Sequence, residues 1–115
     1  MKITIREIGD IAILHITGEI RRTSFEETTL HDLVKSQLER GIRNILFNFE
    51  NVEAIDSFGV GEMLASYTST HNLGGQIKLV RISKKLSLVF KIAWLDRIFE
   101  NFDSEAAALA SFGKS

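Results

Sequence analysis

Two segments of the chain are apolar at almost every position, and they constrain the fold more than any other feature. They are Ile11-Ala12-Ile13-Leu14-His15-Ile16 and Ile45-Leu46-Phe47-Asn48-Phe49. A strand with one face in water alternates apolar and polar residues, whereas a near-continuous apolar run is typical of a strand covered on both faces. The chain therefore has to pack other elements on both sides of a sheet.

Helical periodicity separates these strand-like segments. Leu30, Leu33, Val34 and Leu38 are spaced for one face of a helix between about Ser24 and Gly41. A second face comprises Val60, Met63, Leu64 and Tyr67, and Asn72-Leu73-Gly74-Gly75 ends that helix. Strands that alternate with helices predict parallel pairing.

The full predicted order begins with a hairpin that turns at Gly9-Asp10. We expect strands over 3–8, 11–16, 42–49, 76–80 and 97–99, and helices over 24–41, 57–72, 86–93 and 104–112. The predicted fold class is α/β, with a mostly parallel four- or five-stranded sheet, an antiparallel N-terminal strand and about four helices. We expect residues 1–115 to form a single domain.

Charge and composition narrow the classes of partner. The formal net charge is −1, so no global field attracts nucleic acid or an anionic membrane, and neither is expected as a partner. No apolar run approaches the roughly 20 residues of a membrane helix, and there are no cysteines, so we expect a cytoplasmic protein. The spacing of His15, His31 and His71 indicates no metal site, and no cofactor is expected.

The segment Asp56-Ser57 stands where a buried strand passes into a helix. Asp and Ser are preferred N-cap residues, so capping is one interpretation. Phosphorylation is the other, because a helix N-terminus tolerates the added negative charge of a phosphoserine. Catalysis by Ser57 is disfavoured, since the segment lacks the Gly-x-Ser-x-Gly pattern of hydrolases.

Two motifs resemble one family. Asp56-Ser57-Phe58-Gly59-Val60-Gly61 is similar to the Asp-Ser-x-Gly segment of bacterial STAS-domain anti-sigma factor antagonists. Gly18-Glu19-Ile20 resembles the Gly-Glu-Leu/Ile turn of the same family. The resemblance includes the element order and extends from about Ile3 to Phe112.

This resemblance implies a STAS fold and a binding protein rather than an enzyme. It implies that the chain binds an anti-sigma factor serine kinase, is switched off when that kinase phosphorylates Ser57, and is restored by a PP2C-type phosphatase. Sigma-factor-dependent transcription would thus be regulated by partner switching, with the chain a monomer or weak dimer. The partner-binding residues implied are Gly18, Glu19, Arg21, Asp56, Ser57, Phe58, Gly59 and Val60. The alternative is a non-phosphorylated STAS scaffold or accessory subunit of a transport or sensory complex.

One departure from the family pattern concerns charge. Arg21-Arg22 stands where many antagonists have an acidic or small polar residue. The pair is either an exposed, solvated feature, the mark of a different partner, or a cation that stabilises phosphoserine.

An aromatic cluster near the C-terminus has two interpretations. It comprises Phe90, Trp94, Leu95, Ile98, Phe99 and Phe102. We expect it to close one side of the core; any exposed part would be a docking or dimer patch.

Overall fold

The two apolar segments lie in neighbouring strands at the centre of one sheet. The computed structural model describes residues 1–22 and 28–113. Its strands are β1 (Lys2–Ile8), β2 (Ile11–Ile20), β3 (Asn44–Ile55), β4 (Gln76–Val80) and β5 (Asn101–Phe102), arranged in the order β1-β2-β3-β4-β5. β1 pairs antiparallel with β2, and the other pairings are parallel. The predicted α/β architecture is confirmed.

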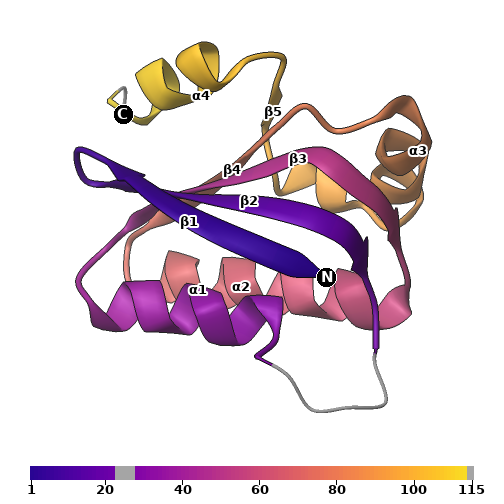
Figure 1. Ribbon diagram of the computed structural model, residues 1–115, viewed down its shortest axis with the longest axis horizontal. Helices are drawn as coiled ribbons and strands as arrows, with labels where there is room; N and C mark the ends of the chain where they lie inside the picture. The colour runs from indigo at the N-terminus through magenta and orange to yellow at the C-terminus, as the bar shows by residue number, and fades with distance from the viewer. Residues whose placement is uncertain (23–27, 114–115) are drawn as a thin grey trace.

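Helices cover both faces of the sheet, as the apolar strands require. They are α1 (Leu30–Glu39), α2 (Ser57–Asn72), α3 (Lys84–Ile92) and α4 (Glu105–Phe112), with a 3-10 turn at Leu95–Arg97. α1, α2 and α3 pack on one face and α4 on the other (Figure 1). None of the helices in the described ranges combines the length and apolarity needed to cross a membrane.

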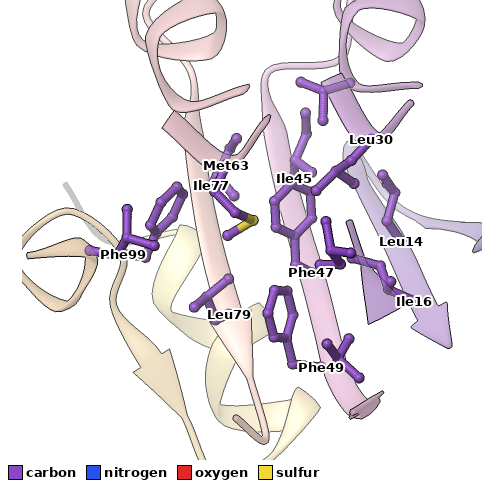
Figure 2. Packing of buried hydrophobic residues seen from close by; sticks show 14 of the residues in the cluster. Leu14, Ile16, Leu30, Ile45, Phe47, Phe49, Met63, Ile77, Leu79 and Phe99 are labelled. Atoms are coloured by element: carbon purple, nitrogen blue, oxygen red, sulfur yellow. The ribbon is translucent and has the colours of Figure 1, made fainter. Parts of the chain in front are cut away.

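β3 supplies side chains to both layers of the core. Ile45, Phe47 and Phe49 are fully buried on the face covered by α1, α2 and α3 (Figure 2). Leu46 points the other way and packs in the cluster that contains Ala108 of α4. This alternation follows from the two-residue period of a strand, and it explains why the segment needs apolar residues at consecutive positions.

The predicted face of α2 is confirmed in part, since Met63 is buried and Val60 and Tyr67 pack against the core. Its buried residues are Gly59, Met63, Ser66 and Thr70, whereas Leu64 is exposed. Thr70 is satisfied within the helix, since its hydroxyl donates to the Ser66 carbonyl at 2.8 Å. Small side chains bring the helix close to its neighbours, and hydrophobicity alone does not reveal such a face.

Several boundaries also differ from the prediction. β2 continues past Gly18, which has φ +99° at a shift of register, and β3 continues to Ile55. Residues 97–99 do not form a strand; β5 is Asn101–Phe102. The start of the predicted helix at 24–27 lies outside the described residues, and α1 begins after Thr29, whose side chain accepts from the Asp32 N–H.

A partly exposed ion pair links α4 to β1 of the sheet. The Arg6 guanidinium donates to both oxygens of Glu105, at 2.7 and 2.8 Å, and the Asn48 amide donates to Oε2 at 2.9 Å. The hydrogen bond from Arg6, supported by that from Asn48, lowers the pKa of Glu105.

We expect Phe49→Ala to destabilise the protein by about 3–5 kcal/mol, because it removes a fully buried ring and leaves a cavity. The lost contacts include the edge-to-face packing on Phe90, with ring centroids 5.7 Å apart. Denaturant unfolding measures the difference. Leu88→Ala, at a site 63% exposed, is the matched control and should change stability by less than about 0.5 kcal/mol.

Glu105→Gln should lower the melting temperature at neutral pH and have a smaller effect in acid. A carboxyl whose pKa is lowered in the folded state contributes stability above its unfolded pKa, and this contribution disappears as the pH falls through the folded pKa. Because the pair is partly exposed, the effect at neutral pH should stay below about 1 kcal/mol. Thermal unfolding across acidic pH tests this, and a difference from wild type that does not shrink in acid contradicts it.

Candidate functional site

The two sequence motifs meet at one edge of the sheet. β2 and β3 run parallel, so their carboxyl ends lie side by side; Glu19 is opposite Ala54 and Ile20 is opposite Ile55. Asp56 and Ser57 follow directly where β3 turns into α2 (Figure 1). The segments 18–22 and 56–60 thus form one continuous region, which we call the Ser57 edge.

Asp56 is the residue that joins these two segments. It is the N-cap of α2, and its Oδ1 accepts the Gly59 N–H at 2.8 Å. Its Oδ2 accepts the Arg22 N–H at 3.3 Å, and its own N–H donates to the Ile20 carbonyl, also at 3.3 Å. One side chain therefore satisfies an orphan donor of the helix and fixes the chain beyond β2.

Gly59 allows the first turn of α2 to approach β2. A Cβ built at this position would lie 2.1 Å from the Ile20 carbonyl oxygen and 2.5 Å from Cγ1 of Ile55. No side chain fits at that separation without a shift of backbone. The glycine is thus explained by helix-to-strand packing.

Ser57 is the first residue of α2 and is exposed. Because Asp56 provides the cap, Ser57 does not, and among the described residues its hydroxyl makes no hydrogen bond. Phe58 and Val60 are half-buried, and Val60 packs against the core. The two interpretations of Asp56-Ser57 therefore fall on different residues: the cap is Asp56, and the free hydroxyl is Ser57.

The remaining predicted residues line the β2 side of the edge. Gly18 and Glu19 are half-buried, and Arg21 is exposed and paired with Glu19, with Nε 2.7 Å from Oε1. Arg22, which was not among the predicted binding residues, lies with its guanidinium 4.8 Å from the centre of the Phe58 ring. The double arginine was the only signal for it, and the sequence did not indicate which of the two packs against Phe58.

Within residues 1–22 and 28–113, no group of His, Asp or Glu side chains is arranged to hold a metal ion. His15 and His31 are engaged elsewhere: Nε2 of His15 is 3.0 Å from the Asn51 amide, and Nε2 of His31 is 2.9 Å from the Ser69 hydroxyl.

Gly59→Ala and Gly61→Ala should have opposite effects on stability. The first forces a methyl group against the Ile20 carbonyl and should cost about 1–3 kcal/mol. At Gly61 a Cβ meets open space, so alanine should stabilise the helix by about 0.5–1 kcal/mol. Thermal unfolding of the two variants makes the comparison, and equal effects would rule out the close approach of α2 to β2.

Comparison with known proteins identifies the family of this chain. The model of the STAS domain matches residues 2–108. An anti-sigma factor antagonist homolog from Thermotoga neapolitana is 35% identical over 72 residues, which are 63% of this chain and 64% of that protein. The chain is thus matched over less than two thirds of the length of this relative.

Solved structures agree with the family model. A crystal structure of an anti-sigma factor antagonist from Thermotoga maritima aligns with a TM-score of 0.82 and 25% identity, over 97% of this chain and 95% of the other. Unphosphorylated SpoIIAA, an anti-sigma factor antagonist, aligns with a TM-score of 0.75 and 19% identity, over 99% and 100%. The structure of SpoIIAA from Bacillus is also known in the phosphorylated form. These relatives are named as anti-sigma factor antagonists, and the chain belongs to the STAS domain family.

Proposed function

We propose that this chain is an anti-sigma factor antagonist whose binding is controlled by phosphorylation of Ser57. In this cycle, the unmodified chain binds an anti-sigma factor serine kinase and thereby releases a sigma factor. The kinase phosphorylates Ser57, which ends the binding, and a PP2C-type phosphatase restores the free hydroxyl. The chain acts as ligand and substrate in the cytoplasm. The names of the relatives support the class of function, and the geometry of the Ser57 edge supports the switch.

The observation that carries this proposal is that Asp56 and Ser57 have different roles in the structure. Asp56 caps α2 and bonds to Arg22, so the local structure depends on its carboxylate. Ser57 is exposed and has no such structural task among the described residues. A kinase can therefore modify Ser57 without removing a contact on which the fold depends.

Because of the charges around Ser57, we expect phosphorylation to change the charge of this surface without unfolding the domain. A phosphoserine carries roughly −1.5 to −2 charges, and the free N–H groups and dipole of α2 stabilise an anion at its first turn. The carboxylate of Asp56 opposes this effect. We infer that Arg22 offsets part of this repulsion, because its N–H donates to Asp56 and its guanidinium packs on Phe58, the residue that follows Ser57. Arg21 is less suited to the role, since it pairs with Glu19.

The proposed partner surface combines both segments of the Ser57 edge. Gly18, Glu19 and Arg21 come from the end of β2, while the start of α2 contributes the residues from Asp56 to Val60. A new charge at the centre of a desolvated patch leaves that charge without water or a counter-ion, which weakens binding strongly.

We expect Ser57→Asp to weaken binding to the cognate kinase about 100-fold, or about 2.7 kcal/mol, while Ser57→Ala binds like wild type. We expect the cognate kinase to be a histidine-kinase-like ATPase whose gene lies beside the gene for this chain. Calorimetric titration of that purified kinase measures the affinities.

Ser104→Asp is the matched control for this experiment. Ser104 caps α4 on the opposite face of the sheet, so the substitution adds the same charge at a helix N-terminus away from the Ser57 edge. It should leave the affinity unchanged. Equal affinities for wild type and Ser57→Asp would overturn the proposal. Phosphopeptide mass spectrometry on protein from its own cells gives a direct check, because persistent absence of phosphate at Ser57 would favour the scaffold function.

A further inference from the structure

α3 presents apolar side chains on the face that points away from the core. Leu86 and Phe90 are 1% and 2% exposed and anchor the helix to the sheet. Leu88 and Ile92 are 63% and 80% exposed, and their spacing of four residues places them together on the opposite side of α3. The predicted aromatic cluster therefore closes the core only in part: Phe90, Leu95 and Phe99 are buried, but Trp94 is 60% exposed.

Trp94 has an unusual backbone as well as an exposed ring. Its φ of 66° and ψ of 12° are left-handed, at the position after the C-cap of α3, where glycine or asparagine is preferred. A bulky residue in this conformation is strained. The ring lies against the Arg97 guanidinium, at 4.4 Å, rather than in the core. Apart from this contact with Arg97, packing among the described residues gives no reason for a tryptophan here.

Cations surround these exposed apolar groups. The complete set, which we call the α3 stripe, is Lys84, Lys85, Leu88, Lys91, Ile92, Trp94 and Arg97. Among the described residues, none of its three lysines forms an ion pair. Asp96, in the 3-10 turn beside Trp94, is the acidic residue nearest in sequence. The stripe is therefore an apolar centre with a predominantly positive rim.

We propose that the α3 stripe is a docking surface for a protein segment whose apolar residues are flanked by Asp and Glu. A protein interface typically has an apolar, aromatic centre and a charged rim, and Trp is among the residues that contribute most to binding. Leu88, Ile92 and Trp94 provide the centre, and the cations around them select an acidic partner. This docking does not depend on phosphorylation of Ser57.

Other occupants fit the charges less well. In a two-fold dimer formed through this stripe, each positive rim would face another positive rim. An anionic membrane would attract the cations of the stripe, but the chain as a whole carries a net charge of −1, and Asp96 lies beside Trp94. An acidic protein segment satisfies both the apolar centre and the cations.

The test places a photo-crosslinking side chain at position 88 of the full chain, in an extract of the cells from which the protein comes. Position 73 is the matched control, because Leu73 is 53% exposed just beyond the C-terminal end of α2. We expect a crosslink from position 88 to a protein, mapped by mass spectrometry to a segment with acidic residues beside apolar ones. Lys84→Glu, Lys85→Glu and Lys91→Glu together should lower its yield at least tenfold, whereas Lys35→Glu should not.

Several outcomes would overturn the proposal. They are crosslinks from position 88 to lipid, to a second copy of the chain or to a segment without acidic residues, a yield no higher than at position 73, or no crosslink. Trp94→Gly separates docking from folding. Glycine accepts the left-handed backbone, so the melting temperature should not fall, but the crosslink yield should fall at least tenfold. An unchanged yield would exclude Trp94 as an anchor.

Discussion

The structure depends on the burial of β3 from every direction. β3 is hydrogen-bonded to β2 along one edge and to β4 along the other, and helices cover both of its faces. Residues 45–49 of β3 are all buried, so the polar groups of their backbone have to pair within the protein. Parallel pairing on both sides then requires crossovers, which α1 and α2 provide on one face. The second face is left for α4.

The Ser57 edge is a geometric consequence of this arrangement. Parallel strands end at the same side of a sheet, and in this chain the end of β2 is brought against the first turn of α2. The absence of a side chain at Gly59 permits the contact, and the carboxylate of Asp56 holds it. These contacts fix the backbone of the Ser57 edge, and Ser57 itself lies exposed at the start of α2.

The sequence predicted those features that depend on local patterns. Continuous apolar runs revealed the buried strands, and the order of elements revealed the parallel sheet. The buried face of α2 was harder to predict from the sequence, because Ser66 and Thr70 are buried for their size rather than their hydrophobicity. The two-residue strand β5 was placed too early, since a pairing that short has no periodicity.

For the candidate site, the sequence pointed to the Asp56-Ser57 segment but could not show which residue caps α2 and which has the free hydroxyl. Both residue types are good N-caps, and only the hydrogen bond from Gly59 to Asp56 shows which one caps α2. For a similar reason, the sequence could not show that Arg22, rather than Arg21, packs against Phe58. Its position depends on contacts with Asp56 and Phe58, which lie more than thirty residues further along the chain.

The exposure of Trp94 also determines what the intrinsic fluorescence of this protein can report. The chain contains one tryptophan and one tyrosine, so nearly all indole emission comes from a ring that already lies largely in water. Loss of the core would change the surroundings of that ring only modestly. Emission from the native protein therefore describes the outer surface of α3, and circular dichroism is the more informative signal for unfolding.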